Sequence, residues 1–200
     1  MSSIVISGDT SGAITLAAPS VAGTNTATLP AAAGTVMVSG NMPAFSAYLA
    51  TSNQSVTSST WTALSAQTKE FDTATAYNNT GSTTTLNGIS VPAYSFAPNV
   101  AGYYQVNGEI NATCTSGSQM NISIYKNGSE FKRGFAIVGG SFSQYCLPVS
   151  ALIYMNGTSD YITLYGVIVA TSPVYVSGTG GQFGSFDFGT NSYMLISAEL

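Results

Sequence analysis

Residues 96–114 read FAPNVAGYYQVNGEINATC, and their side chains alternate in character with a period of two. One alternate set is almost wholly apolar: Tyr104, Val106, Gly108, Ile110, Ala112 and Cys114. The other set is wholly polar: Gln105, Asn107, Glu109, Asn111 and Thr113. Successive side chains of a strand point to opposite faces, so this pattern predicts a long, half-buried β-strand. Such a strand needs a second sheet against its apolar face.

Similar short runs follow one another along the rest of the chain. They predict further strands at 44–49, 61–64, 120–125, 130–137, 143–155, 161–169, 173–176 and 193–200. Asn127-Gly128 and Asn156-Gly157 are signals for tight hairpin turns, and Pro148 predicts an edge or a bulge in its strand. The only candidate for a helix is the short segment 42–49. The predicted fold class is therefore all-β, an antiparallel two-sheet sandwich or jelly roll.

Residues 1–40 differ from residues 41–200 in having only very short strand candidates, separated by turn-like sequences. These candidates are 4–6, 13–16, 27–29 and 35–38. They offer too little apolar area for a monomeric core, so three copies wind together or the segment lies on a larger assembly; the alternative is a flexible leader. We interpret 1–40 as a β-rich anchor or trimerisation segment and 41–200 as a head domain.

The charge of the chain excludes several classes of partner. Charged residues make up 6% of the sequence, against a usual ~25%, and the net charge is −4. Without a basic patch, binding to nucleic acid or to anionic lipid is not expected. No run of 18 apolar residues predicts membrane insertion, and the N-terminus MSSIVISGDT does not resemble a secretion signal. The surface must consist largely of hydroxyls and amides, which suits neutral contacts with sugars or proteins.

The inventory of reactive side chains predicts a protein that is not an enzyme. The chain has no histidine, which excludes Ser-His-Asp catalysis and His-based zinc sites. The spacing of its eight acids singles out no catalytic pair. No cofactor is expected. The less favoured alternative is a bound calcium ion, with Asp187 as the candidate ligand. Cys114 and Cys146 are interpreted as small buried hydrophobes rather than as a disulfide.

The spacing of Phe96, Gly102 and Tyr104, Phe-x5-Gly-x-Tyr, resembles the signature of the complement-q globular head, one of the tumour-necrosis-factor-like jelly rolls. Weaker pieces follow in the family's order at 44–48, 71–72, 77–78, 124–128, 160–164 and 192–200. The resemblance covers 44–200, although Val106 and Gly108 stand where the family has aromatics. It implies a signature and core made of Phe45, Tyr48, Phe71, Phe96, Gly102, Tyr104, Val106, Ile162 and Leu164.

The leader, residues 8–36, resembles segments of bacteriophage fibre and other virion proteins, and it lacks the collagen repeat. The resemblance implies a homotrimer on the virion surface. We expect a non-enzymatic protein that decorates or stabilises the capsid or forms a short head fibre, with 1–40 contacting the major capsid protein or another virion protein. The alternatives are the tip of a tail fibre that recognises host surface glycan and a secreted tumour-necrosis-factor-like binding head.

Tyrosines and two glycine-containing segments are the candidate contact residues. The predicted trimer interface consists of Tyr103, Tyr125, Tyr165, Tyr193 and Leu195. The predicted outer contact loops are 138–141 and 178–189, with Gly139, Gly140, Gly180, Gly181, Phe183 and Asp187 as the candidate residues. The alternative for the tyrosines is core packing, and for the loops it is plain connection of strands.

Overall fold

The computed structural model describes residues 3–17, 20–21, 23–24, 42–50, 52–177 and 181–184. The chain forms two compact units, Met1–Val36 and Met37–Leu200, which are described separately below. Every regular element within the described ranges is a β-strand. The predicted boundary between residues 40 and 41 lies outside the described residues.

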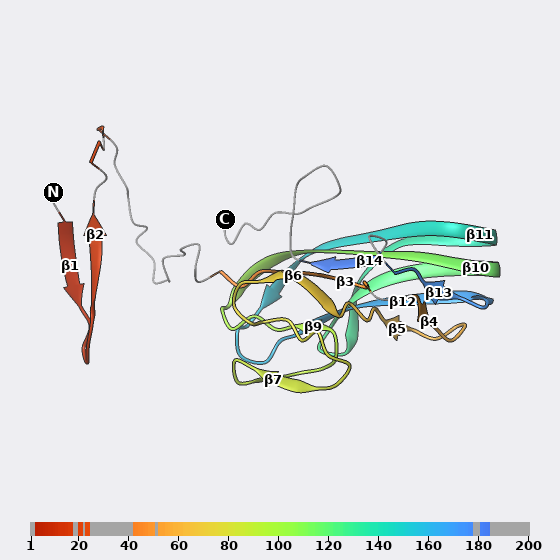
Figure 1. The fold of residues 1–200 in the computed structure, drawn as a ribbon, viewed down its shortest axis with the longest axis horizontal. Coiled ribbons are helices and arrows are strands. Elements are labelled where there is room, and N and C mark those ends of the chain that lie inside the picture. Colours follow the sequence, from red (N-terminus) through yellow and green to blue (C-terminus); the bar gives the residue numbers. More distant parts are fainter. Residues whose placement is uncertain are drawn as a thin grey trace. The chain divides into compact units, whose positions relative to one another are not determined.

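The described residues of the first unit contain one hairpin (Figure 1). Strand β1 (Ser3–Ser7) pairs with strand β2 (Ala13–Ala17) in antiparallel register, with Ile4 opposite Leu16 and Ile6 opposite Ile14. The turn contains Gly12, whose φ of 79° favours glycine. The strands predicted at 27–29 and 35–38 lie outside the described residues.

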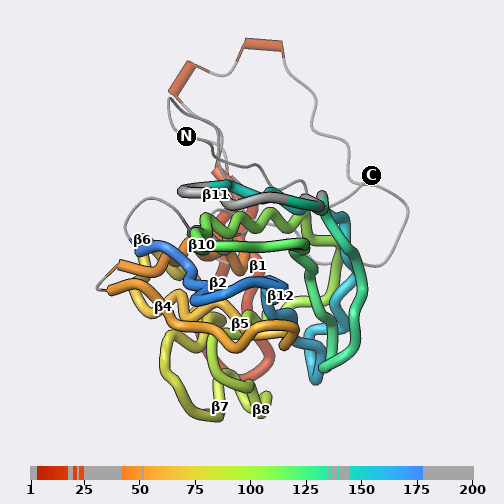
Figure 2. The backbone as a smooth tube through the Cα atoms, turned by 90° about the vertical axis from the view of Figure 1, so that its right-hand side faces the viewer, coloured from red at the N-terminus to blue at the C-terminus, as the bar shows by residue number. Residues whose placement is uncertain are grey.

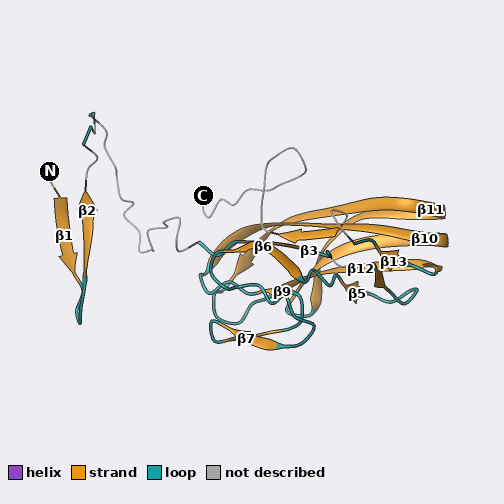
Figure 3. Ribbon diagram, in the orientation of Figure 1, coloured by secondary structure: helices purple, strands orange, loops and turns teal. Residues whose placement is uncertain are grey.

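The second unit carries the remaining strands (Figure 3). Their bounds are β3 (Phe45–Tyr48), β4 (Gln54–Ser55), β5 (Thr62–Ala63), β6 (Thr68–Asp72), β7 (Thr84–Leu86), β8 (Ile89–Val91), β9 (Ser95–Phe96), β10 (Gly102–Lys126), β11 (Ser129–Met155), β12 (Ile162–Thr171), β13 (Val174–Tyr175) and β14 (Gly181–Gly184). The segments predicted as strands up to residue 176 lie in strands with shifted ends, although the four predicted between residues 96 and 155 are joined into two long strands. The short segment 42–49 contains a strand, not a helix. The strand predicted at 193–200 lies outside the described residues.

One hairpin of unusual length dominates the second unit. Strands β10 and β11, of 25 and 27 residues, pair from Lys126↔Ser129 at the turn to Gly102↔Met155 at the far end. The turn is the predicted one, and Asn127 and Gly128 both have the positive φ that a type I′ turn requires (52° and 79°). The prediction of four separate strands in this region was wrong. The ladder continues through the turn-like residues 115–118, because register shifts accommodate them without ending the pairing.

The two halves of β10 belong to opposite layers of a sandwich. The first half pairs with β13 and β14, beyond which lie β3 and β6; the second half pairs with β12, beyond which lie β5 and β9. A Cβ atom on Gly108 of the first half would lie 2.5 Å from Leu164 Cδ1 of β12, so the layers meet face to face. Figure 2 shows both long strands bending. The predicted antiparallel two-sheet sandwich is confirmed.

The core lies between these layers and includes the apolar side chains of residues 104–114. Val106, Ile110 and Ala112 are fully buried. At one end, the ring of Phe45 stacks on the rings of Tyr77 and Phe96, with centroids 4.5 Å apart in both pairs. The apolar face of β10 is thus buried, whereas its polar face is partly covered, with Gln105 and Asn107 at intermediate exposure and Asn111 buried.

Strand β11 is one edge strand of the sandwich, and β4 and β6 are others at the ends of the described strand order. Within the described part of the chain β11 pairs with β10 alone, so it forms the edge of both layers. Pro148 lies in this strand opposite Glu109. The prediction of an edge position from Pro148 is confirmed, since proline donates no hydrogen bond to a second neighbour.

Candidate functional site: an edge groove and an aromatic cluster

The hairpin of the first unit has one strongly apolar face. Ile4, Ile6, Ile14 and Leu16 share this face, and each is more than half exposed, from 55% to 67%. The opposite face carries Ser, Thr and Ala side chains around a single Val5. An isolated two-stranded hairpin is marginally stable in water, and large exposed apolar patches mark interaction sites. The first unit therefore presents a surface that suits burial against another protein surface.

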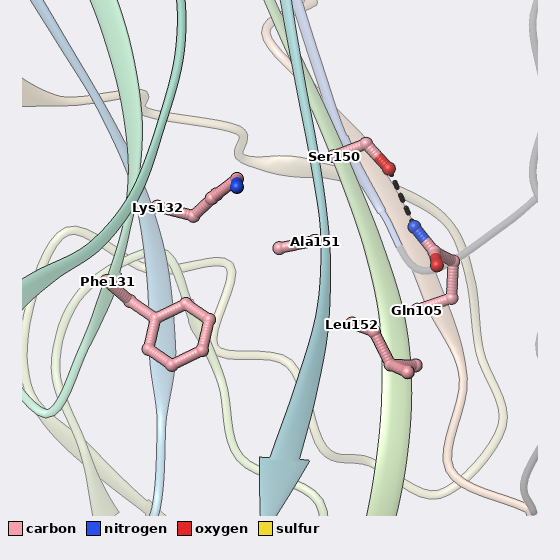
Figure 4. Close-up of a pocket in the computed structure, with 6 residues that line it drawn as sticks. All are labelled: Gln105, Phe131, Lys132, Ser150, Ala151 and Leu152. Atoms are coloured by element: carbon pink, nitrogen blue, oxygen red, sulfur yellow. Dashed lines mark hydrogen bonds between the residues drawn. The ribbon is translucent and has the colours of Figure 1, made fainter.

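The head has an open groove of about 530 Å³ along its β11 edge (Figure 4). Phe131 and Lys132 come from the start of β11, and Ser150, Ala151 and Leu152 come from its last part, so two halves of one strand form the walls. Phe131 is 48% exposed and Leu152 is 57% exposed. These exposures are high for large apolar side chains lining a concave surface.

The groove contains a cation without an ion-pair partner. Lys69 pairs with Asp72, Lys126 with Asp160 and Arg133 with Glu130, whereas Lys132 makes no ion pair within the described residues. An amine beside an apolar wall is well placed to meet an acid on an incoming surface.

An exposed tyrosine pair extends the apolar surface along the same edge. Tyr103 and Tyr154 lie opposite each other in the β10–β11 ladder, with ring centroids 5.3 Å apart in an edge-to-face arrangement. Next to them Gln105 lies opposite Leu152, and its Nε2 donates a 2.6 Å hydrogen bond to Ser150 Oγ. The groove and the tyrosine pair form one surface, which we call the edge surface (Phe131, Lys132, Ser150–Leu152, Tyr103, Gln105 and Tyr154).

A second group of aromatics lies on the outer face of the β10–β12 layer. Tyr125 and Tyr165 have ring centroids 4.3 Å apart, and Trp61 lies 5.9 Å from Tyr125. The guanidinium of Arg133 lies 5.4 Å from the centre of the Trp61 ring and makes two hydrogen bonds to the Glu130 carboxylate, of 2.7 and 2.8 Å. These hydrogen bonds hold the pKa of Glu130 below its usual range.

Two acids of the head, Asp160 and Asp72, hold loops. Asp160 receives hydrogen bonds from Asn127 Nδ2 (2.7 Å) and Asn156 N (3.0 Å), and its Oδ2 lies 2.8 Å from Lys126 Nζ. Asp72 accepts from the backbone N–H groups of Ala76 and Tyr77. No three metal-ligating side chains gather within the described residues, and Asp187 lies outside them.

Comparison with known proteins gives the fold and no closer relationship. No model of a protein family matches the sequence, and no curated protein matches it. Among solved structures, Eiger TNF from S. frugiperda is similar at a TM-score of 0.51 and 10% identity, over 79% of this chain and 96% of that one. Murine APRIL at pH 5.0 gives a TM-score of 0.48 and 11% identity, over 72% and 97%. The fold is a tumour-necrosis-factor-like jelly roll.

Most of the signature residues lie inside this jelly roll. Phe45, Phe96, Tyr104, Val106, Ile162 and Leu164 are buried, while Tyr48 and Gly102 are partly exposed. Phe71 is 38% exposed and does not belong to the core, because it lies on strand β6 at the margin of its layer. Of the residues that the resemblance implied, six are thus buried between the layers and Phe71 is not.

The structure separates the predicted interface tyrosines. Tyr103 lies on the edge surface, whereas Tyr125 and Tyr165 lie together on the other layer of the jelly roll. Tyr193 and Leu195 lie outside the described residues. Alternation placed these tyrosines in strands, but the assignment of a strand to one layer or the other depends on pairing between distant parts of the chain.

The predicted outer contact loops are corrected by the structure. Gly139 and Gly140 lie in strand β11, since the long ladder continues through them, and Gly181 and Phe183 lie in strand β14. Gly180 and Asp187 lie outside the described residues. Both cysteines are free; Cys114 is buried as expected, but Cys146 is exposed on the outward face of β11.

Phe131, Lys132 and Leu152 are the contact residues that sequence reasoning missed. A signal was present in the last part of β11. Leu147, Val149, Ile153 and Met155 keep the alternation of buried apolar side chains, and Leu152 breaks it by placing an apolar residue on the outward face. Leu152 lies next to exposed Tyr154 on the same face, and a contiguous group of exposed apolar side chains is typical of an interaction surface.

Within the described residues there is no helix long and apolar enough to cross a membrane.

Proposed function

We propose that this chain is a non-enzymatic, homotrimeric surface protein of a bacteriophage particle, which decorates or stabilises the capsid or forms a short head fibre. The observation that carries the proposal is the exposed apolar face of the first unit, Ile4, Ile6, Ile14 and Leu16. A unit of this kind gains stability when it is anchored on a larger assembly or joined to other copies. The leader's resemblance to virion proteins makes the particle the preferred assembly.

The edge surface supports the trimeric part of the proposal. It combines exposed Phe131 and Leu152 with an unpaired lysine at the free edge of both layers. A patch on an edge that meets a different patch on the next copy closes into a ring when the rotation is right. The trimer is tested by native mass, which we expect to be three times the 20.5 kDa of one chain. The mass of a single chain at micromolar concentration would contradict the trimer.

The experiment that tests the location is copy number in purified virions, measured by quantitative mass spectrometry against the major capsid protein. Hundreds of copies would support decoration of the capsid lattice. A few to a few dozen would indicate a fibre at the tail or at vertices, and recognition of host glycan would then become the leading function. Absence from particles would overturn the virion proposal and leave a secreted binding head.

A further inference from the structure

The aromatic cluster on the outer face of the β10–β12 layer does not belong to the hydrophobic core. Trp61, Tyr125 and Tyr165 are half-buried and lie apart from the side chains that pack between the layers. Trp61 comes just before β5, Tyr125 from the end of β10 and Tyr165 from the middle of β12. Three elements distant in sequence therefore bring aromatic rings together on a surface where the core gains nothing from them.

The polar tips of this cluster have no hydrogen-bond partners among the residues that the structure describes. Neither tyrosine hydroxyl nor the indole N–H of Trp61 makes a hydrogen bond within the described residues. Buried tyrosine hydroxyls elsewhere are paired, for example Tyr175 to the Thr62 carbonyl at 3.1 Å. Burial is the largest cause that raises the pKa of both Tyr125 and Tyr165, so both hydroxyls stay protonated at neutral pH and remain able to donate.

The charges beside the rings cancel each other. Glu130 and Arg133 form a bidentate pair of one anion and one cation. Lys132 lies between them in sequence but belongs to the groove at the edge. A phosphate or a sialic acid would need a cation that is not already satisfied, and the cluster has none within the described residues. The chemistry that fits is neutral, with apolar faces and many hydroxyls.

We propose that Trp61, Tyr125 and Tyr165, with the Glu130–Arg133 pair, bind a neutral glycan. The C–H faces of a pyranose ring pack on the aromatic rings. Sugar hydroxyls accept from the tyrosine hydroxyls and the indole N–H, and they bond to the outward atoms of Glu130 and Arg133. The proposal depends neither on a trimer nor on a particle, and it assigns a function to a surface other than the edge surface.

The site carries its own reporter, because Trp61 is the only tryptophan of the chain. The experiment titrates the full chain with neutral hexasaccharides of glucose, mannose, galactose and N-acetylglucosamine and follows tryptophan emission, with calorimetry as an independent measure. We expect saturable binding of at least one of them. Tyr165→Ser and Arg133→Gln should each weaken that binding about tenfold or more. Tyr154→Ser, a change of an exposed tyrosine on the edge surface, should leave it unchanged.

Three results would overturn the proposal: no saturable binding of any of the four sugars, equal affinity in wild type and in both site variants, or stronger binding of a sialylated sugar than of its neutral parent. Arg133→Gln is included because the Arg133 side chain is half exposed, at 51%, so we expect the substitution to leave the jelly roll folded. Far-ultraviolet circular dichroism of each variant verifies that the jelly roll is intact.

Discussion

Asp160 illustrates how single side chains hold the ends of the long strands. It joins the Asn127–Gly128 hairpin turn to the loop between β11 and β12 by accepting from Asn127 and Asn156 while facing Lys126. The second hairpin turn predicted at Asn156-Gly157 is not formed, because β11 and β12 do not pair with each other. Its side chain is 9% exposed, so removal of its charge leaves a partly buried ammonium without its partner. We predict that Asp160→Asn lowers the free energy of unfolding by about 2 kcal/mol. Glu130→Gln, in a more exposed pair, should cost less than about 1 kcal/mol. Urea unfolding at fixed protein concentration measures both, and equal losses would contradict the prediction.

The same carboxylate gives the stability of the head a pH dependence. Burial alone would raise the pKa of Asp160, but the hydrogen bonds from Lys126, Asn127 and Asn156 outweigh it and lower the pKa. A carboxyl with a lowered folded pKa contributes stability above its unfolded pKa of about 4 and loses it as the pH falls through the folded value. We therefore expect the difference in free energy of unfolding between wild type and Asp160→Asn to be largest at pH 7 and to decrease below pH 4. A gap that stays constant to pH 2 would contradict this.

At this scale the sequence predicted well what depends on alternation. The apolar faces of β10 and β12 follow from a period of two, and Asn127-Gly128 follows from the φ that its turn demands. The exposure of Phe71 could not be predicted, because a strand that is central or marginal in its layer carries the same local pattern. The burial of a residue in such a strand depends on which neighbours arrive from elsewhere in the chain.

The hairpin of β10 and β11 depends on two glycines that allow close approach. A Cβ on Gly134 would lie 2.6 Å from the Pro148 carbonyl oxygen. This oxygen belongs to the backbone, so the strand itself would have to shift to relieve the clash. A Cβ on Gly108 would meet the end of the Leu164 side chain, which is able to rotate. We predict that Gly134→Ala lowers the free energy of unfolding by about 2–3 kcal/mol and that Gly108→Ala costs less. Thermal unfolding of both variants provides the measurement, and the reverse order would contradict it.

The length of these two strands was not predictable from their sequences. Residues 115–118 read TSGS, which is typical of a loop, and 138–141 read VGGS. In the structure these segments face each other in the ladder, with Gly117 opposite Gly140. Each of these segments has a low propensity for strand, so the sequence predicts a break in the strand at both. Only their pairing with each other shows that both strands continue.

Across the whole molecule, the edge surface and the hairpin of the first unit lead to separate predictions. For the edge surface, Leu152→Asn places an amide where we propose that a second copy packs. Full burial of a leucine is worth roughly 2 kcal/mol, so we expect association to weaken at least about tenfold. Native mass at several concentrations should show single chains appearing for Leu152→Asn and not for Val169→Asn on strand β12. Unchanged trimers in both variants would exclude the edge surface as the contact.

For the hairpin, two neighbouring residues provide a matched pair. Ile6 and Val5 are equally exposed, at 55% and 58%, but they lie on opposite faces. We predict that Ile6→Ser lowers the number of copies retained on purified particles at least tenfold and that Val5→Ser changes it little, because Val5 is the only large apolar side chain on its face of the hairpin, among Ser, Thr and Ala. Equal retention of both variants would show that the apolar face is not the anchor.

The shared hairpin also sets how the jelly roll opens. Because β10 and β11 contribute to both layers, neither layer can detach while the ladder between them stays closed. Amide protons in the first and second halves of β10 should therefore exchange with deuterium at one common, slow rate, as parts of a single cooperative unit. Refolding should begin beside the Asn127–Gly128 turn, where contacts are local, and reach Gly102 and Met155 last. We therefore expect the head to unfold in a single cooperative transition, without a partly unfolded intermediate.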